Sequence, residues 1–324
     1  MRVGVKVAAI TAVTSLALAG CGGGSTQAGA DGYPMTIENC GHDVVVDHKP
    51  ERVVALGPSE VTTITTAGGA SKLVGRDDAG LRSAPYPPAM RAATANVPQL
   101  GTGGEVTREA IIDARADLVV GKSTETVNPD TLSAVNIPLY ALRGNCGSNH
   151  APGTSDGTSD FEDVFSDLTV LGKLFGTEQQ ASAAIADMKK RIAATKAPAS
   201  LQGKSAAALI VFKNGLEAYG SQAMSHTQLQ TLGLRDVFGD TPKRVFEANI
   251  EEIIARNPDV VVLYSYNETP EQAKQNFLRI PGAANLNAVK NKTVLVQPYE
   301  LSSQGALAVN GLENMAKNLG KPQR

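Results

Sequence analysis

The sequence contains no tryptophan and only 14 other aromatic residues, seven Tyr and seven Phe, among its 324 residues. It also has no basic excess, because 30 Lys and Arg stand against 32 Asp and Glu, a formal net charge of −2. Binding to a nucleic-acid backbone needs such an excess, so we expect no nucleic-acid partner. Beyond the first twenty residues no apolar run approaches the length of a membrane span, so we expect none in the mature chain.

Motifs that would indicate catalysis or a metal site are also scarce. The sequence has no P-loop and no H-E-x-x-H, and Gly101-Thr102-Gly103-Gly104 does not complete a nucleotide fingerprint. The four His are not grouped in pairs at the spacing of a zinc-type site. We therefore expect no enzyme, no metal ion and no resident cofactor. An enzyme on the same scaffold is kept as an alternative.

The amino terminus carries a clear targeting pattern. Residues 1–20 contain two cations, a nearly uncharged stretch and then small residues, the layout of a secretory signal peptide. The segment ends Leu18-Ala19-Gly20-Cys21, which resembles the bacterial lipobox, and a flexible Gly/Ser-rich tether follows over 21–34. We expect an extracytoplasmic protein, held on the cell membrane by lipid chains at Cys21. The alternative is a chance Cys in an ordinary signal peptide.

Two further cysteines, Cys40 and Cys146, are left for the folded part of the chain. An oxidising compartment favours a disulfide between them. Closing a loop of about 100 residues would contribute up to ~4.7 kcal/mol in the chain-entropy model. The alternatives are two buried free thiols, or a Cys/His metal site that uses His42 or His150.

Short apolar runs bounded by turn residues recur along the chain and predict buried strands. Two β-rich segments, 35–38 and 44–47, predict a hairpin around Cys40. The other predicted strands are 52–56, 73–77, 118–123, 137–140, 207–212, 260–264 and 293–296. Helical stretches separate them, including segments near 226–232 and 250–256 and a last helix over 306–319. This alternation predicts an α/β fold with parallel sheets.

The longest helical pattern runs from about 160 to 196 and is interrupted once, at Gly176. Thr177 and Gln180 have the spacing of a capping box, and apolar residues then repeat at helical spacing. The second helix would be ~28 Å long, enough to cross between two lobes. The predicted division is an amino-terminal lobe over 35–176, a linking helix over 177–197 and a carboxyl-terminal lobe over 198–324.

An internal repeat supports two similar lobes. Residues 109–120 align with 251–262 without gaps, and six of the twelve positions are identical. Each copy has a Glu that opens a helix, an Ile pair that packs, an Asp in the turn and a Val-rich strand.

These pieces together resemble the ABC-importer substrate-binding proteins that bind ferric siderophores, haem or cobalamin. The resemblance rests on the two repeat units and on three further segments, Arg52-Val-Val-Ala-Leu-Gly-Pro-Ser-Glu60, Leu73-Val-Gly-Arg-Asp77 and Tyr219-Gly-Ser-Gln-Ala-Met-Ser-His-Thr-Gln-Leu229. It implies two Rossmann-like lobes with parallel central sheets, joined by a single long helix. It also implies a monomer that captures an iron chelate, a ferric siderophore, and delivers it to permease subunits. Haem or cobalamin is the alternative ligand. A surface interaction protein whose cleft has lost its ligand is a third reading.

The resemblance further implies one permease-docking carboxylate on each lobe. By their place in the repeat these are Glu109 and Glu251, although Glu105 or Glu252 could replace them. Helix-opening carboxylates are exposed and favoured by the helix dipole in any protein, which is the alternative explanation. Ala116 departs from the family, which usually has Pro there, as at Pro258.

Ligands of open α/β sheets bind beyond the carboxyl ends of the strands, which predicts a site in the interlobe cleft. The candidate ligand-binding residues are Ser59, Arg76, Arg143, Tyr219, His226, Tyr264, Tyr266 and Tyr299, and Lys122 and Ser123 also qualify. Arg suits an anionic chelate, and Tyr supplies flat contact area with a hydroxyl. Haem would instead need an axial His or Tyr, for which His150 and His226 are candidates. The polar stretch 144–160 predicts a loop, either a lid or solvated.

Overall fold

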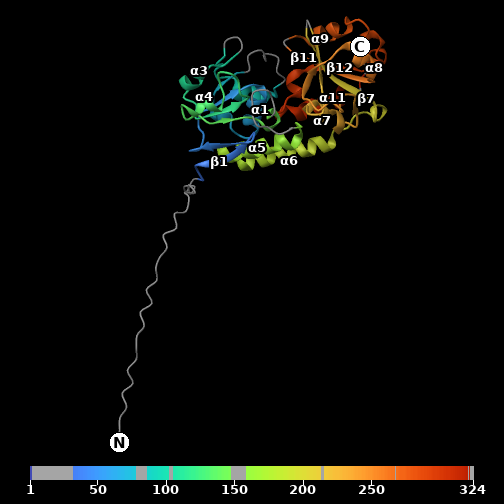
Figure 1. Cartoon of the computed structure of the whole chain (residues 1–324). Coiled ribbons are helices and arrows are strands. Elements are labelled where there is room, and N and C mark those ends of the chain that lie inside the picture. Colours follow the sequence, from blue (N-terminus) through green and yellow to red (C-terminus); the bar gives the residue numbers. More distant parts are fainter. Residues whose placement is uncertain are drawn as a thin grey trace.

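The computed structural model describes Met1 and residues 32–77, 86–101, 105–146, 158–212, 215–266, 268–319 and 321. Apart from Met1, the predicted signal peptide lies outside these residues, as do Cys21, His150 and most of the 144–160 loop. Figure 1 shows two α/β lobes side by side. In the described ranges no helix has both the length and the apolar character that a membrane crossing needs.

The first lobe is built on a four-stranded parallel sheet with the order β4-β3-β5-β6. Its strands are β3 (Val53–Leu56), β4 (Leu73–Arg76), β5 (Leu118–Gly121) and β6 (Leu139–Tyr140). Its helices are α1 (Pro58–Thr66), α2 (Pro88–Thr94), α3 (Arg108–Asp113) and α4 (Pro129–Ser133). The apolar residues of β3 and β5 are buried on both faces, which is why continuous Val-rich runs predicted these strands correctly.

The predicted hairpin at the start of the chain is also present, as β1 (Met35–Asn39) paired antiparallel with β2 (His42–Val46). The Cys40–Cys146 disulfide joins it to the first lobe, with 5.1 Å between the two Cα atoms. Next to the disulfide, the Asn39 side chain donates to the Ala141 carbonyl and accepts from the Ala141 amide, both at 2.8 Å. The predicted disulfide is confirmed.

The second lobe has a six-stranded sheet whose main path is β10-β8-β7-β11-β12. Its strands are β7 (Ser205–Phe212), β8 (Gly215–Tyr219), β9 (Arg235–Asp236), β10 (Val245–Glu247), β11 (Val260–Ser265) and β12 (Val294–Pro298). Its helices are α7 (Met224–Thr231), α8 (Ile250–Arg256), α9 (Pro270–Leu278), α10 (Asn287–Lys290) and α11 (Leu307–Leu319).

The prediction of a wholly parallel sheet in this lobe needs correction, because β8 pairs antiparallel with both β7 and β10. Phe212 is paired with Gly215 across the β7–β8 connection. A connection this short can join only antiparallel strands, so the sheet is mixed. Strands β8 and β10 are not among the strands predicted from the sequence.

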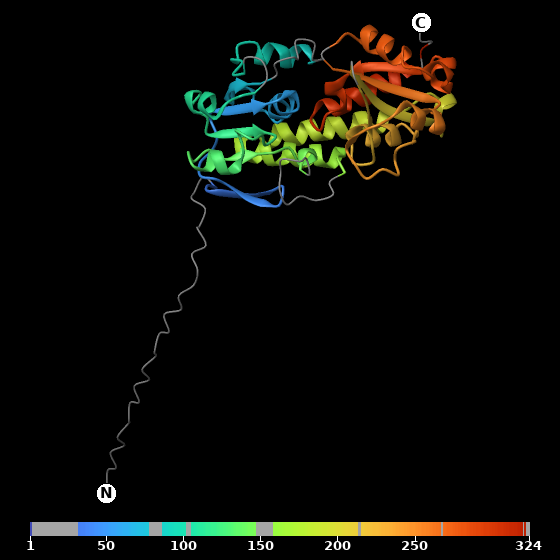
Figure 2. The same cartoon turned by 45° about the horizontal axis from the view of Figure 1, so that its top comes forward.

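Two helices, α5 (Phe161–Phe175) and α6 (Glu178–Ala194), pack together and run along both lobes (Figures 1 and 2). The α5 end near Ser159 is tied to the second lobe, where the Ser159 amide donates to the Gln222 carbonyl. Helix α6 then leads back to that lobe, and it covers most of the linking segment that we propose at 177–197. Gly176 separates the helices with a left-handed φ of 65°.

The prediction of a capping box at the start of α6 is wrong. The Thr177 side chain accepts no capping hydrogen bond, and its hydroxyl donates instead to the Ala67 carbonyl. Tertiary contact with the end of α1 has therefore taken the place of the local cap.

The repeated sequence units have the same structure in both lobes. Asp117 accepts hydrogen bonds from the amides of Glu51 and Arg52, immediately before β3. Asp259 accepts from the amide and the hydroxyl of Ser205, at the start of β7. Each Asp thus joins the start of its own strand to the neighbouring parallel strand, which explains why the repeat keeps this residue.

One apolar core extends through both lobes and includes residues of α1, α5, α6, α7 and α11. The outer face of each sheet has a smaller core of its own. The lobes also touch directly, because the Ala306 amide donates to the Thr63 hydroxyl at 3.3 Å. At Gly305 a Cβ atom would lie only 2.7 Å from the Ser59 carbonyl oxygen, so glycine permits this contact.

Candidate ligand-binding site

A hollow of about 240 Å³ lies on one face of the second lobe's sheet. It is lined by Ile210, Phe212, Glu217, Tyr219, Arg244, Val245, Tyr266 and Tyr299. These residues come from β7, β8, the start of β10 and the segments that follow β11 and β12. Three predicted ligand-binding residues are therefore brought together here: Tyr219, Tyr266 and Tyr299.

Three of the rings, those of Phe212, Tyr266 and Tyr299, form a row that we call the aromatic row. The Tyr266 ring stands edge to face with Tyr299 at 5.4 Å between centroids and with Phe212 at 6.5 Å. The central ring is 47% exposed, so it offers open aromatic surface to a ligand. A second edge-to-face pair, Tyr219 with Tyr264, lies at 5.4 Å.

Tyr264, another predicted ligand-binding residue, lies below the surface and is only 1% exposed. Its hydroxyl is buried without a hydrogen-bond partner among the described residues, and burial raises the pKa of Tyr264. Tyr264 therefore supports the Tyr219 ring from beneath.

Arg244 is the cation of the hollow, and sequence reasoning missed it. The segment 241–244 runs beside Gly220, whose amide donates to the Arg244 carbonyl. A Cβ at Gly220 would lie 2.4 Å from the Thr241 oxygen and 2.6 Å from the Lys243 oxygen, so this close approach needs glycine. Burial raises the pKa of Tyr299 while the nearby Arg244 guanidinium acts to lower it, which places the two groups close together.

In the first lobe, the predicted candidate Lys122 directly follows β5, and it is not among the residues that line the hollow. Burial lowers the pKa of Lys122, the charge of Arg244 lowers it further, and Glu60 acts in the opposite direction. The positive charge of Arg244 in the second lobe therefore disfavours the charged form of Lys122. Neighbouring Ser123 is buried, at 7% exposure.

Glu60 lies in α1 with 3% of its surface exposed. Burial raises the pKa of Glu60 to about 8, so this carboxyl is mostly uncharged at neutral pH. The Asn145 side-chain amide donates to Glu60 Oε1 at 3.2 Å. Glu60 is thus a buried polar group beside Lys122 and gives it little charge compensation.

Four other predicted ligand-binding residues do not line this hollow. Ser59 is buried where its backbone meets Gly305. Arg76 Nε donates to the Val97 carbonyl at 3.2 Å. Arg143 lies against α5, where its amide donates to the carboxylate of Asp167. The fourth residue is His226.

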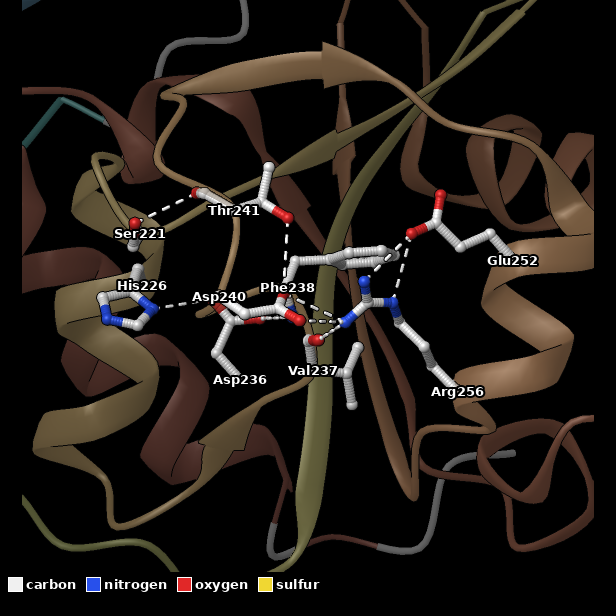
Figure 3. A network of polar contacts seen from close by, with 9 residues as sticks. All are labelled: Ser221, His226, Asp236, Val237, Phe238, Asp240, Thr241, Glu252 and Arg256. Atoms are coloured by element: carbon white, nitrogen blue, oxygen red, sulfur yellow. Dashed lines mark hydrogen bonds and ion pairs between the residues drawn. The ribbon is translucent and has the colours of Figure 1, made fainter.

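His226 belongs to a polar network that holds the loop after β9 (Figure 3). Its Nδ1 lies 2.8 Å from Oδ2 of Asp236. On the other side of that loop, the Arg256 guanidinium lies over the Phe238 ring at 4.8 Å and bonds to Asp240. The loop leads directly to Arg244, so the network positions this cation.

The two predicted docking carboxylates occupy equivalent places, in the first turns of α3 and α8. The side chain of Glu109 is 71% exposed, and Glu251 is also exposed. Both lobes have a first-turn ion pair here: Glu109 lies 3.6 Å from the Arg108 guanidinium, and Glu252, next to Glu251, lies 3.1 Å from that of Arg256. Figure 1 shows α3 and α8 toward opposite ends of the molecule, both away from α6.

Neither a metal centre nor a catalytic centre emerges from the part of the chain that the structure describes. No group of three or more His, Cys, Asp and Glu residues is arranged there to hold a metal ion. The string Gly153-Thr154-Ser155-Asp156-Gly157 fits the G-x-S-x-G pattern of serine hydrolases but lies outside the described residues. No apolar strand precedes it in the sequence, as a nucleophile elbow requires.

Comparison with known proteins identifies the family. The model of the periplasmic binding protein family matches residues 53–301. The ABC transporter substrate-binding lipoprotein YvrC of Bacillus subtilis is 22% identical, and the match covers 98% of this chain and 97% of that protein.

Solved structures give the same result. The structure of an ABC-type Fe3+-hydroxamate transport system from Saccharomonospora viridis has 30% identity and a TM-score of 0.77, over 89% of this chain and all of that one. A periplasmic heme-binding protein of Pseudomonas aeruginosa has 24% identity and a TM-score of 0.66, over 83% of this chain and 92% of its own. This second likeness shows the fold alone. The chain therefore belongs to the periplasmic binding protein family and is a substrate-binding protein of an ABC importer, not an enzyme.

Proposed function

We propose that this protein captures a ferric siderophore in the hollow of the second lobe and delivers it to the importer's permease. The observation that carries the proposal is the aromatic row with Arg244 beside it. The exposed ring of Tyr266 offers a flat face to the organic arms of a chelate. Arg244 offers charge-assisted hydrogen bonds to the oxygens that surround the iron. The similar structure from Saccharomonospora viridis is that of an ABC-type Fe3+-hydroxamate transport system, which supports a ferric siderophore as the ligand class.

Haem and cobalamin are the competing ligands. Haem iron needs an axial side chain, and His226 is already bound to Asp236. Among the described residues that line the hollow there is no His, so one of the three tyrosines, Tyr219, Tyr266 or Tyr299, would have to bind the iron. A chelate that brings all of its own iron ligands needs no such residue, and the hollow suits it better.

The proposal includes a lipid anchor and a docking surface. We propose that Cys21 carries the acyl chains and that the tether over 21–34 leaves the folded lobes free to reach the permease. Glu109 and Glu251 would then contact cationic residues of the permease, one on each lobe. Their exposure and their separation support this role.

Ligand titration tests the proposal. Because the chain has no Trp, its intrinsic fluorescence comes from its seven Tyr, and three of them, Tyr219, Tyr266 and Tyr299, line the hollow. We expect ferric siderophores to quench it saturably, and Tyr266→Ala to weaken binding about tenfold, which is ~1.4 kcal/mol. Val45→Ala, an exposed substitution in the β1–β2 hairpin, is the control and should bind normally. Saturable binding of haemin or cobalamin without binding of any ferric siderophore would overturn the proposal.

A further inference from the structure

We infer that Glu217 is a specificity-determining residue of the hollow, and that the siderophore which this protein captures carries a free cationic amine. The inference rests on the proposed function and narrows its ligand class. It favours a ferric chelate from which an ammonium-bearing arm extends toward Glu217. A chelate of the same shape without that charge binds less tightly.

Glu217 lies on the face of β8 that forms the hollow. Successive side chains of a strand point to opposite faces, so Glu217 shares its face with Tyr219, and both line the hollow. Ala218 between them is fully buried in the core of the opposite face. On the neighbouring strand β7, the residue paired with Glu217 is Ile210, which also lines the hollow. The partly exposed carboxylate of Glu217 is therefore part of the wall that a ligand meets.

A second carboxylate stands directly beside Glu217. On the other side of β8, Glu217 is paired with Glu247 of the antiparallel strand β10. Residues directly opposite each other project from the same face, and like charges in such a pair destabilise a sheet. In the part of the chain that the structure describes, neither side chain accepts a hydrogen bond or lies within 4.0 Å of a Lys, Arg or His nitrogen. A cation bound at Glu217 would relieve the repulsion between the two carboxylates.

The hollow has groups of opposite charge at two separate places. Arg244 is held beside Gly220, the residue that follows β8, and Glu217 lies three residues earlier along the chain. The rise of a strand places the backbones at Glu217 and Gly220 ~10 Å apart. Arg244 and Glu217 both line the hollow and form no ion pair with each other. One chelate can therefore present oxygens to Arg244 and an ammonium group to Glu217.

The surroundings of Glu217 have space for an ammonium group. Gly215 is the next residue on the same face of β8, and an added Cβ there would meet no atom of the described residues within 4 Å. Phe212, the residue of β7 paired with Gly215, belongs to the aromatic row. The faces of aromatic rings attract cations. An amine that enters here meets a carboxylate and aromatic surface together.

The ligand class follows from the charge of the iron complex. Three hydroxamate groups neutralise Fe3+, so a tris-hydroxamate complex with a free amine has a net positive charge at neutral pH. The same complex with an acylated amine has none. Only the first complex can form a charge-assisted hydrogen bond with Glu217.

The test compares two ferric complexes on the purified full chain by tyrosine fluorescence. Ferrioxamine B is a linear tris-hydroxamate with a free terminal amine, and N-acetylferrioxamine B has the same iron centre without the charge. We expect the wild-type protein to bind ferrioxamine B at least about tenfold more tightly than the acetylated complex. Glu217→Gln should remove this preference by weakening the binding of ferrioxamine B, with a change of less than about twofold for the acetylated complex.

Three further measurements distinguish selectivity from a structural role. Glu217→Asp keeps the charge and should retain a preference for ferrioxamine B. Glu125→Gln, at an exposed position of the first lobe, is the control and should bind as wild type. Glu217→Gln should be at least as stable as wild type in urea, because it removes the repulsion from Glu247. A variant that is less stable and binds neither complex would make Glu217 a structural residue and overturn the inference.

The outcomes separate this inference from the proposed function. Equal binding of both complexes by the wild-type protein, or equal weakening of both by Glu217→Gln, would overturn the inference and leave siderophore capture intact. A preference for ferrioxamine B that disappears in Glu217→Gln would support both. A folded wild-type protein that binds neither complex but binds haemin saturably would overturn the inference together with siderophore capture.

Discussion

The Nδ1 atom of His226 lies 2.8 Å from Oδ2 of Asp236, and this pair is buried between α7 and β9. The Asp236 side chain is only 1% exposed, and its other oxygen accepts from the Phe238 amide at 2.9 Å. The pair therefore anchors the beginning of the loop that ends at Arg244. In this position His226 organises the hollow from outside it.

His226→Ala should destabilise the fold more than it weakens ligand binding. The substitution leaves the buried Asp236 carboxylate short of a partner, so we expect a loss of about 1–3 kcal/mol in the free energy of unfolding. Urea denaturation measures the loss, and His48→Ala, at an exposed position, is the control. Wild-type stability combined with a large loss of siderophore affinity would make His226 a ligand contact instead.

Asp167 should make stability depend on pH. Its side chain is fully buried and accepts from the Tyr140 hydroxyl at 2.7 Å, and burial raises the pKa of Asp167 from 3.8 to about 8. Between these two values the folded state holds a proton that the unfolded state has lost. The contribution of this group is therefore complete below about pH 4 and is lost as the pH rises toward 8.

Asp167→Asn tests that dependence, because it keeps an acceptor and removes the titration. Relative to wild type, the variant should gain stability steadily as the pH is raised from about 5 to 8, measured by urea denaturation at each pH. The exposed substitution Asp113→Asn is the control. A stability difference that does not change with pH would show that Asp167 is ionised in the folded protein.

Removal of the Cys40–Cys146 bridge should destabilise the protein. The two residues are 106 positions apart, and a closed loop of this size contributes up to ~4.7 kcal/mol in the chain-entropy model. The double variant Cys40→Ser with Cys146→Ser should lose part of this amount, because the two hydrogen bonds between Asn39 and Ala141 still hold the hairpin. Denaturation in urea measures the loss. Reduction of the wild-type protein removes the same bridge without changing the sequence and is the matched control.

The docking carboxylates should affect transport and not affinity. The double variant Glu109→Ala with Glu251→Ala removes two exposed charges that lie outside the hollow, so siderophore binding should be unchanged while uptake by cells is lost. Glu178→Ala, an exposed first-turn Glu of α6, should transport normally. A clear fall in ligand affinity in the double variant would contradict the assignment.

Much of the fold could be predicted because its signals are local. A buried parallel strand is a short apolar run, so β3, β5, β7 and β11 were recognised. The repeat at 109–120 and 251–262 indicated two lobes of related structure, and both copies have the predicted helix, turn and strand. By contrast β8 and β10 are short and partly exposed, with weaker alternation, and they were missed together with Arg244.

By itself, the sequence determined the α/β class, the strands that are continuous apolar runs, the duplicated unit, the disulfide partners and the supply of Tyr residues near the strand ends. Only the tertiary structure decided that Tyr219, Tyr266 and Tyr299 share one hollow with Arg244, while His226 turns to Asp236. The physical reason is the separation along the chain of the residues that interact. Backbone conformation and burial pattern follow from neighbours along the chain, whereas the direction of a side chain depends on packing between segments that are distant in the sequence.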